Sequence, residues 1–266
     1  MRLRSNPSWR LPQRVHTLAE RWLSGHSEPM MTGRVYRPRD YHGFVETAPL
    51  SPDDGEELAG KLAAECELNE SVMLLATCGY QLKPVLAALR DMGMTYHNPY
   101  RPSETAWNPL SEAKHGVAAM SRLRALVAPS PWDRETVTLW AELLKKECFA
   151  GDDRTAILKP ERVGFGALSD FLQPSVVDAI GRADLDALAP MCYARFHPAM
   201  EYAGAVVRRA GPVGLSETPR AVIGTVHSVK GAQADLVYLL PHLSPAGEDD
   251  RVHSGDHGVD AAIRLR

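Results

Sequence analysis

The chain has 266 residues and a mass of 29.2 kDa, with 44% hydrophobic residues, 24% charged residues and a formal net charge of -3. This composition is that of an ordinary globular protein, and it excludes collagen, intrinsic disorder and a disulfide scaffold. The acidic balance permits a local nucleic-acid groove but excludes a wholly basic binding surface.

The sequence predicts neither a membrane span nor a zinc ribbon. No stretch approaches 18 consecutive apolar residues, so we expect no transmembrane helix and no membrane partner. The four cysteines contain no C-x-x-C pair, which excludes the zinc-ribbon and thioredoxin patterns. We therefore expect reduced thiols and a cytoplasmic location.

Two amphipathic helices are predicted near the start of the chain. Residues 11–24 carry apolar side chains at helical spacing. Residues 51–68 form a second such pattern, in which Ser51 suits the N-cap and Pro52 suits the first helical position. The stripe of this second helix is Leu58, Leu62 and Cys66.

A strand, a helix and a second strand follow. The continuous apolar run at 72–76 is typical of a strand that is buried on both faces. Helical spacing over about 81–92 and a short strand over 94–97 complete a β-α-β unit. This order predicts a parallel sheet with right-handed crossovers.

The predicted secondary structure changes twice in the later part of the chain. Helical signals dominate from about 110 to 209, and strand signals return at 221–226 and 234–240. The simplest organisation is an α/β domain made of 1–98 plus 212–266, interrupted by a helical insertion over 99–211.

One pattern imitates a phosphate-binding loop. Residues 55–61 read G-x-x-x-x-G-K, but Leu62 replaces the Ser or Thr that must hold magnesium. Glu56 and Glu57 would repel a triphosphate, whereas acidic residues suit the first turn of a helix. We interpret this segment as helix and not as a phosphate loop.

A histidine pair imitates a metal site. His253 and His257 have H-x3-H spacing with aspartates nearby, but no cysteine pair accompanies them. We interpret this segment as a solvated polar loop and assign no metal site to the chain.

Two other segments carry polar chemistry in a suggestive order. Residues 224–239 run from a strand through a turn with hydroxyl, imidazole, ammonium and glycine groups into a second strand. The carboxyl ends of parallel strands are where open sheets bind ligands. In residues 8–12, Trp9 and Arg10 open a helix, and such a pair can stack on a base and contact a phosphate.

These segments resemble motifs of the superfamily 1 DNA helicases of the UvrD/Rep type. Residues 224–239, GTVHSVKGAQADLVYL, resemble motif V, which reads T-[IVL]-H-[SK]-x-K-G-x-E. Residues 8–19, SWRLPQRVHTLA, resemble motif IV, and residues 72–101 resemble the strand, turn and helix that follow it. Over 100–211 the resemblance is one of position only, because that family inserts its helical 2B subdomain there.

The resemblance implies a P-loop NTPase fold, namely a second RecA-like motor domain (2A) with parallel sheet, flanking helices and an inserted helical subdomain. Trp9 would stack on adenine and Arg10 would act as an arginine finger on the γ-phosphate of ATP. Gln233 replaces the family's ribose-contacting Glu, which keeps an acceptor and loses the charge. The implied contacts to single-strand DNA are Thr225, His227, Ser228, Lys230 and Gly231.

The family's P-loop domain and its arginine-bearing motif VI are not found in this sequence. We therefore expect the C-terminal motor-domain portion of an ATP-dependent DNA helicase, acting on single-strand DNA. Its ATP and Mg²⁺ would be held by an N-terminal P-loop domain, so the isolated chain should not hydrolyse ATP. The alternatives are a non-enzymatic module that binds single strands or a partner protein, and an inactive helicase remnant, which Gln233 favours slightly.

Overall fold

A computed structural model describes the protein, which divides into two compact units. One unit consists of residues 1–50 and 243–266, and the other consists of residues 51–242. The predicted assignment of 99–211 to a separate insertion stays a prediction. The residues that the structure describes are 6–7, 11–24, 36–98, 108–110, 123, 126, 134–151 and 170–254.

The first unit contains the predicted N-terminal helix. Helix α1 spans Gln13–Ser24, directly after Pro12, which confirms the helix predicted at 11–24. Strands β1 (Asn6–Pro7) and β2 (Tyr36–Arg37) pair in parallel as a two-stranded sheet. Helix α10 spans Pro245–Ser254.

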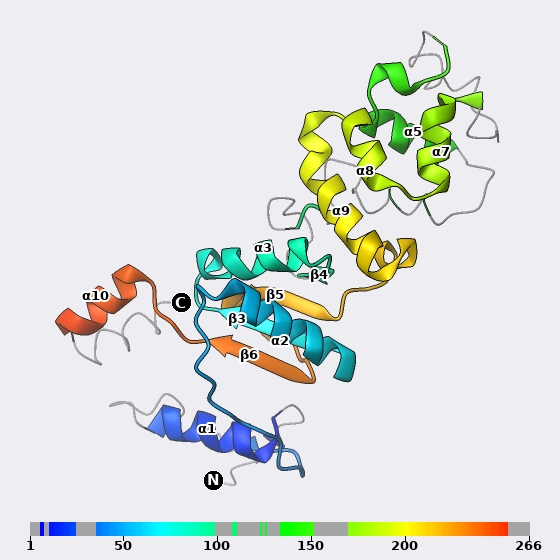
Figure 1. Ribbon diagram of the computed structural model, residues 1–266. Helices are drawn as coiled ribbons and strands as arrows, with labels where there is room; N and C mark the ends of the chain where they lie inside the picture. Colours follow the sequence, from blue (N-terminus) through cyan, green and yellow to red (C-terminus); the bar gives the residue numbers. More distant parts are fainter. Residues whose placement is uncertain are drawn as a thin grey trace. The chain divides into compact units, whose positions relative to one another are not determined.

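A four-stranded, all-parallel sheet forms the centre of the second unit (Figure 1). Its strands are β3 (Val72–Ala76), β4 (Tyr96–His97), β5 (Ala221–Thr225) and β6 (Leu236–Leu240), in the order β4-β5-β3-β6. The predicted parallel sheet is therefore confirmed, and the two apolar runs at 72–76 and 221–225 lie side by side in it. The fold is α/β with flanking helices.

A reciprocal contact fixes the register of β6 against β3. Ser71, just before β3, donates from its backbone N–H and its Oγ to the Asp235 carboxylate, at 2.9 Å each. The Asp235 N–H donates back to the Ser71 carbonyl at 3.1 Å. Because Asp235 comes just before β6, both strands start level, with Val72 opposite Leu236.

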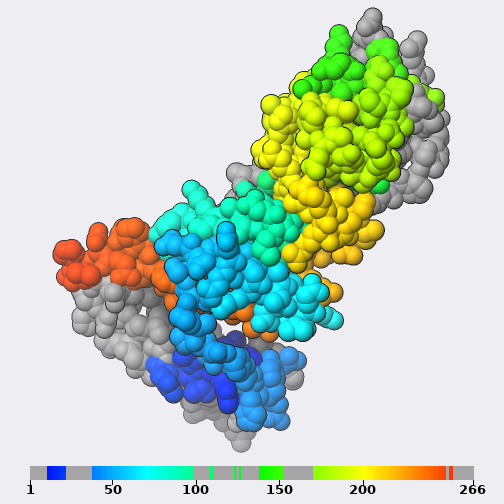
Figure 2. Space-filling view, in the orientation of Figure 1, coloured from blue at the N-terminus to red at the C-terminus, as the bar shows by residue number. Residues whose placement is uncertain are grey.

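Helices α2 (Gly55–Leu68) and α3 (Lys83–Asp91) pack on each other and cover one face of the sheet, with α2 directly against β3. Their atoms form one continuous surface in Figure 2. Side chains alternate across a strand, so Val72, Leu74 and Ala76 share a face, and all three are fully buried. The predicted stripe of Leu58, Leu62 and Cys66 is buried as well, which confirms it.

The prediction that Ser51 caps α2 is wrong. The helix begins at Gly55, and the Asp54 carboxylate accepts the Glu57 N–H at 3.2 Å. The Ser51 hydroxyl instead accepts the Asp53 N–H at 3.2 Å, in the turn that precedes the helix. A carboxylate is the stronger acceptor and also complements the positive end of the helix, so Asp54 takes the cap.

The connection from β5 to β6 crosses β3 without a helix. Residues 226–235 contain only the short turn η8 (Val226–Val229) before the chain enters β6. Val229 is buried in a cluster with Met73, Leu75 and Val222, and Ala232 and Ala234 pack against this cluster. The connection therefore covers the second face of the sheet.

The remaining described elements are helical. They are η1 (Gly79–Leu82), α5 (Arg134–Leu143), η3 (Lys146–Cys148), α7 (Pro174–Gly181), α8 (Leu185–Leu188), η5 (Ala189–Met191), η6 (Ala194–Phe196), α9 (His197–Ala210) and η7 (Pro212–Leu215). Trp140 in α5 and Leu144 directly after it are fully buried. Every helix within the described ranges is too short or too polar to cross a bilayer.

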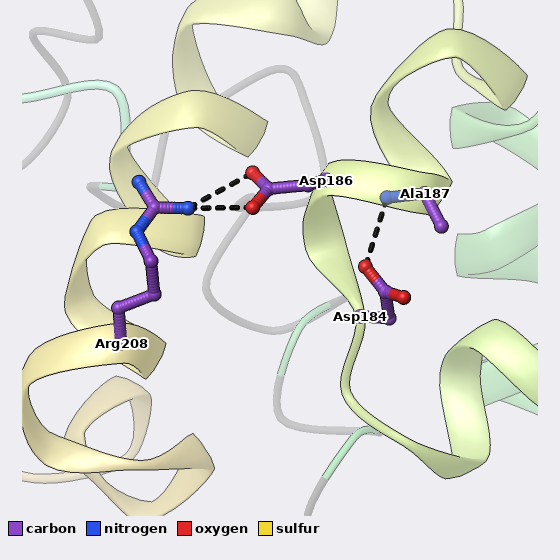
Figure 3. A network of polar contacts seen from close by, with 4 residues as sticks. All are labelled: Asp184, Asp186, Ala187 and Arg208. Atoms are coloured by element: carbon purple, nitrogen blue, oxygen red, sulfur yellow. Dashed lines mark hydrogen bonds and ion pairs between the residues drawn. The ribbon is translucent and has the colours of Figure 1, made fainter.

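A polar network joins α8 to α9 (Figure 3). One guanidinium nitrogen of Arg208 donates to both carboxylate oxygens of Asp186, at 2.7 and 2.9 Å. Asp184 caps α8 by accepting the Ala187 N–H at 3.0 Å. Because the ion pair is largely exposed, it contributes at most about 1 kcal/mol, and the buried Leu185 and Leu188 carry the packing.

Helix α9 approaches the turn between α3 and β4 very closely. Gly93 has φ +65°, and a Cβ there would lie 2.2 Å from the Ala205 carbonyl oxygen. The Tyr202 hydroxyl donates to the Met94 carbonyl at 2.8 Å, and its ring stacks on Tyr96 with centroids 5.8 Å apart. Burial raises the pKa of Tyr202 well above its usual value, so this phenol remains a neutral donor.

We predict that Gly93→Ala destabilises the protein by at least about 2 kcal/mol, because it adds a left-handed penalty to a backbone clash. The matched control is Gly60→Ala in α2, where nothing lies within 4 Å of the added Cβ. That variant should gain up to about 1 kcal/mol from helix propensity. The midpoint of urea unfolding measures both, and equal midpoints for the two variants would contradict the packing described.

Candidate functional site

The four parallel strands end at one edge of the sheet. We call it the carboxyl edge, and define it by residues 77–83 after β3, 97–98 at the end of β4, 225–231 from the last residue of β5 onward, and 241–242 after β6. Parallel sheets bind ligands at this edge, because the loops that leave the strands carry the variable polar groups. Most of the residues that the sequence singled out lie here.

The hydroxyls of Thr225 and Ser228 build the turn after β5. The Thr225 Oγ1 accepts the Ser228 N–H at 3.2 Å, and the Ser228 hydroxyl donates to the Thr225 carbonyl at 2.9 Å. The hydrogen of Ser228 is thereby used inside the turn, whereas Thr225 keeps its own hydrogen for another acceptor. Ser228 therefore shapes the turn, and Thr225 is the better placed of the two to donate outward.

A buried amide supports this turn from the neighbouring strand. Asn98 is 6% exposed, and its Nδ2 donates to the Ile223 carbonyl and to the Ser228 Oγ, at 3.2 Å each. A Cβ at Gly224 would lie 2.6 Å from that nitrogen, so only glycine fits at this position of β5. Sequence reasoning missed Asn98, although a polar residue directly after a buried parallel strand was an available signal.

His227 and Lys230 are the exposed polar groups of the turn. Neither side chain forms a hydrogen bond or an ion pair with the rest of the described chain. Gly231 follows with φ +88°, a conformation that favours glycine, and the Ala232 N–H closes the turn onto the Val229 carbonyl at 2.9 Å. An imidazole and an ammonium group are thus displayed together on a fixed backbone.

The residues predicted to contact the nucleotide are not gathered at the carboxyl edge in the described part of the chain. Gln233 is exposed, beyond the turn, on the connection that crosses the sheet. Trp9 and Arg10 lie outside the described residues. The structure therefore brings together the segment from Thr225 to Gly231 and leaves the predicted nucleotide contacts as predictions.

The edge also contains a neutral histidine. His97 ends β4, and burial lowers its pKa below the ordinary value. His97 is therefore uncharged at neutral pH and adds no positive charge beside Asn98. The fixed cation of the turn is the ammonium group of Lys230.

The segment that imitates a phosphate loop is helical, as the sequence indicated. Residues 55–61 form the first turns of α2, and the Lys61 ammonium pairs with the Glu57 carboxylate at 2.9 Å. A helix has no room to wrap a triphosphate with backbone N–H groups, and this lysine already has an anionic partner. These residues do not fit the phosphates of ATP.

The prediction of a polar loop around His253 is wrong. His253 lies in α10, where its Nδ1 is 2.8 Å from the Asp249 carbonyl, one helical turn away. His257 lies outside the described residues. Across the described ranges, no three His, Cys, Asp or Glu side chains gather as a metal site would require.

Comparisons with known protein families, with characterised proteins and with solved structures find no significant match. The chemistry of the carboxyl edge is therefore inferred from its own residues. Those residues supply hydrogen-bond donors and a positive charge on a turn held by Asn98, and such groups are complementary to an anion.

We predict that Asn98→Ala lowers the free energy of unfolding by about 1–3 kcal/mol, because it leaves the Ile223 carbonyl without this donor. Ser228→Ala should act through the same network, so the double variant should cost less than the sum of the single variants. Asn69→Ala is the matched control, since the Asn69 amide also donates twice, to Glu65 at 2.9 and 3.1 Å, but away from this edge. Combined with Ser228→Ala it should be additive. Additivity for both pairs in urea unfolding would contradict the network.

Proposed function

We propose that this chain is the C-terminal motor-domain portion of an ATP-dependent DNA helicase or translocase. In this proposal the α/β unit has the RecA-like form of the P-loop NTPase fold, and the carboxyl edge contacts the backbone of single-strand DNA. The support is the resemblance of residues 224–239 to motif V, together with the position of that segment at the carboxyl end of a buried parallel strand.

The observation that carries the proposal is the pair of exposed side chains on a fixed turn. His227 and Lys230 are displayed by η8 and the residue after it, and Thr225 retains a hydroxyl hydrogen. A phosphodiester offers only acceptor oxygens and a negative charge, so a hydroxyl, an imidazole N–H and an ammonium group complement it. A local site of this kind is compatible with the net charge of -3.

The nucleotide part of the proposal concerns a partner domain. Trp9 would stack on the adenine of ATP, Gln233 would accept from the ribose, and Arg10 would stabilise charge on the transferred phosphoryl group. Mg²⁺ would be held by the partner, since residues 55–61 of this chain do not form a phosphate-binding loop. ATP bound there would supply the free energy of its hydrolysis. Trp9, Arg10 and Gln233 of this chain would complete the binding site.

A second candidate is a non-enzymatic module that binds single strands. The specific observation in its favour is that the carboxyl edge is built entirely from residues of this chain, while the only G-x-x-x-x-G-K pattern is helical. Adding a separately produced P-loop domain distinguishes the two, because only a motor-domain portion should restore DNA-stimulated hydrolysis.

We predict that the double variant His227→Ala/Lys230→Ala binds oligo-dT at least about tenfold more weakly than the parent chain. The salt dependence should also flatten, by roughly 0.7 units of logarithmic slope for the lost lysine. Lys146→Ala, an exposed lysine in η3, is the matched control and should bind as the parent does. Fluorescence anisotropy at several salt concentrations measures this, and unchanged affinity in the double variant would refute the assigned surface.

We also predict that the isolated chain has no DNA-stimulated ATPase activity, because Lys61 is ion-paired within a helix and cannot serve as a phosphate-loop lysine. The measurement is phosphate release with ATP, Mg²⁺ and oligo-dT. Steady turnover that follows the protein through purification, and that Lys61→Ala abolishes, would contradict our interpretation of residues 55–61.

A further inference from the structure

A second buried amide lies at the carboxyl edge, after β3. Gln81 is 7% exposed and belongs to the short turn η1 (Gly79–Leu82). Its Oε1 accepts from the Thr77 hydroxyl at 3.1 Å and from the Cys78 N–H at 3.0 Å, and its Nε2 donates to the His242 carbonyl at 3.0 Å. The Thr77 hydroxyl also contacts the His242 carbonyl. One side chain thus ties the end of β3 to the end of β6.

Buried amides of this kind are few. In the described chain the buried polar side chains are His16, Gln81, Asn98 and Asn108. Burying an amide is unfavourable unless its donors and acceptors are satisfied, and a satisfied network fixes the backbone around it. Gln81 fixes the turn after β3, just as Asn98 supports the turn after β5, so both turns are held rigidly at the same edge.

The rigid turn η1 displays an aromatic side chain. Tyr80, next to Gln81, is 48% exposed, and Lys83 is exposed at the start of α3. Strand β3 is the direct neighbour of β5, with Ala76 opposite Thr225, and η1 contacts β5. Tyr80 and His227 therefore leave adjacent strands at one edge, four and two residues beyond that opposed pair.

We propose that Tyr80 is a base-stacking residue of the single-strand site, a role that rests on the proposed function. The turn after β5 offers groups that suit a phosphate, and the turn after β3 offers a ring that suits the π-face of a base. Stacking needs a ring whose position is already fixed, because ordering it on binding would cost affinity. The Gln81 network fixes the backbone that carries the ring, and Lys83, three residues further along the chain, adds an exposed positive charge.

The test compares two probes that share a backbone and differ in their bases. Fluorescein-labelled oligo-dT and an abasic oligonucleotide of the same length are titrated with the full chain at one fixed salt concentration. Tyr80→Ala should weaken oligo-dT binding by about tenfold and leave binding of the abasic strand unchanged. Tyr80→Phe keeps the ring and should restore the affinity for oligo-dT.

Tyr41→Ala is the control, because Tyr41 is 47% exposed and lies outside the carboxyl edge. It should bind both probes as the parent does, and urea unfolding should show equal midpoints for both alanine variants. If His227→Ala/Lys230→Ala weakens binding and Tyr80→Ala does not, the stacking role is refuted while the proposed function stands. Equal losses on both probes for Tyr80→Ala would also refute it. If the parent chain binds neither probe, the proposed function fails, and the stacking role with it.

Discussion

The parallel pairing of both β5 and β6 with β3 is the constraint on which the candidate site depends. Because all three strands run in the same direction, the chain must return from the carboxyl end of β5 to the amino end of β6 across β3. It does so within residues 226–235, which is too short for an ordinary crossover helix. Burial of Val229 against Met73 and Leu75 anchors this crossing, and His227 before it and Lys230 after it are exposed. The display of His227 and Lys230 is thus a consequence of sheet topology.

The buried amides of Asn98 and Gln81 hold the turns at the carboxyl edge in fixed positions. Asn98 connects the end of β4 to the turn after β5, and Gln81 connects the end of β3 to the end of β6. Each amide joins two strands beyond the point where those strands pair, since β4 pairs with β5 only as far as Val222 and β3 pairs with β6 only as far as Leu240. A carboxyl edge without them would fray, because strand ends have few neighbours to restrain them. The two buried amides therefore fix the backbone at the carboxyl edge, where the exposed polar side chains of the site lie.

The sequence alone was sufficient for the α/β class and for the central strands. A continuous apolar run such as Val72–Ala76 has one good explanation, a strand covered on both faces, and the structure confirms it. The N-cap of α2 was not predictable to the residue, because Ser51 and Asp54 both satisfy the local rule and only the geometry of the preceding turn decides between them. Asn98 could have been singled out as a polar residue directly after a strand, but the hydrogen-bond partners of Asn98 and Gln81 were out of reach for another reason. Their acceptors lie 125 and 161 residues away, and no local pattern reports a contact over that separation.

The charge of the protein sets a limit on what the carboxyl edge can achieve through electrostatics. Each phosphate neutralised on a single strand contributes roughly 0.7 to the logarithmic salt slope, and only a few cations stand at this edge in a chain of net charge -3. Lys230 and Lys83 are exposed there, and His97 is held neutral by burial, so few phosphates can be compensated. Further affinity for a single strand must then come from a contact that does not depend on counterion release. An aromatic ring provides one, since every base presents a π-face whatever the salt concentration. Under the proposed function, the combination of few charges, rigid turns and an exposed tyrosine favours a short, sequence-tolerant contact with a single strand, of the kind that a translocating domain must repeatedly make and release.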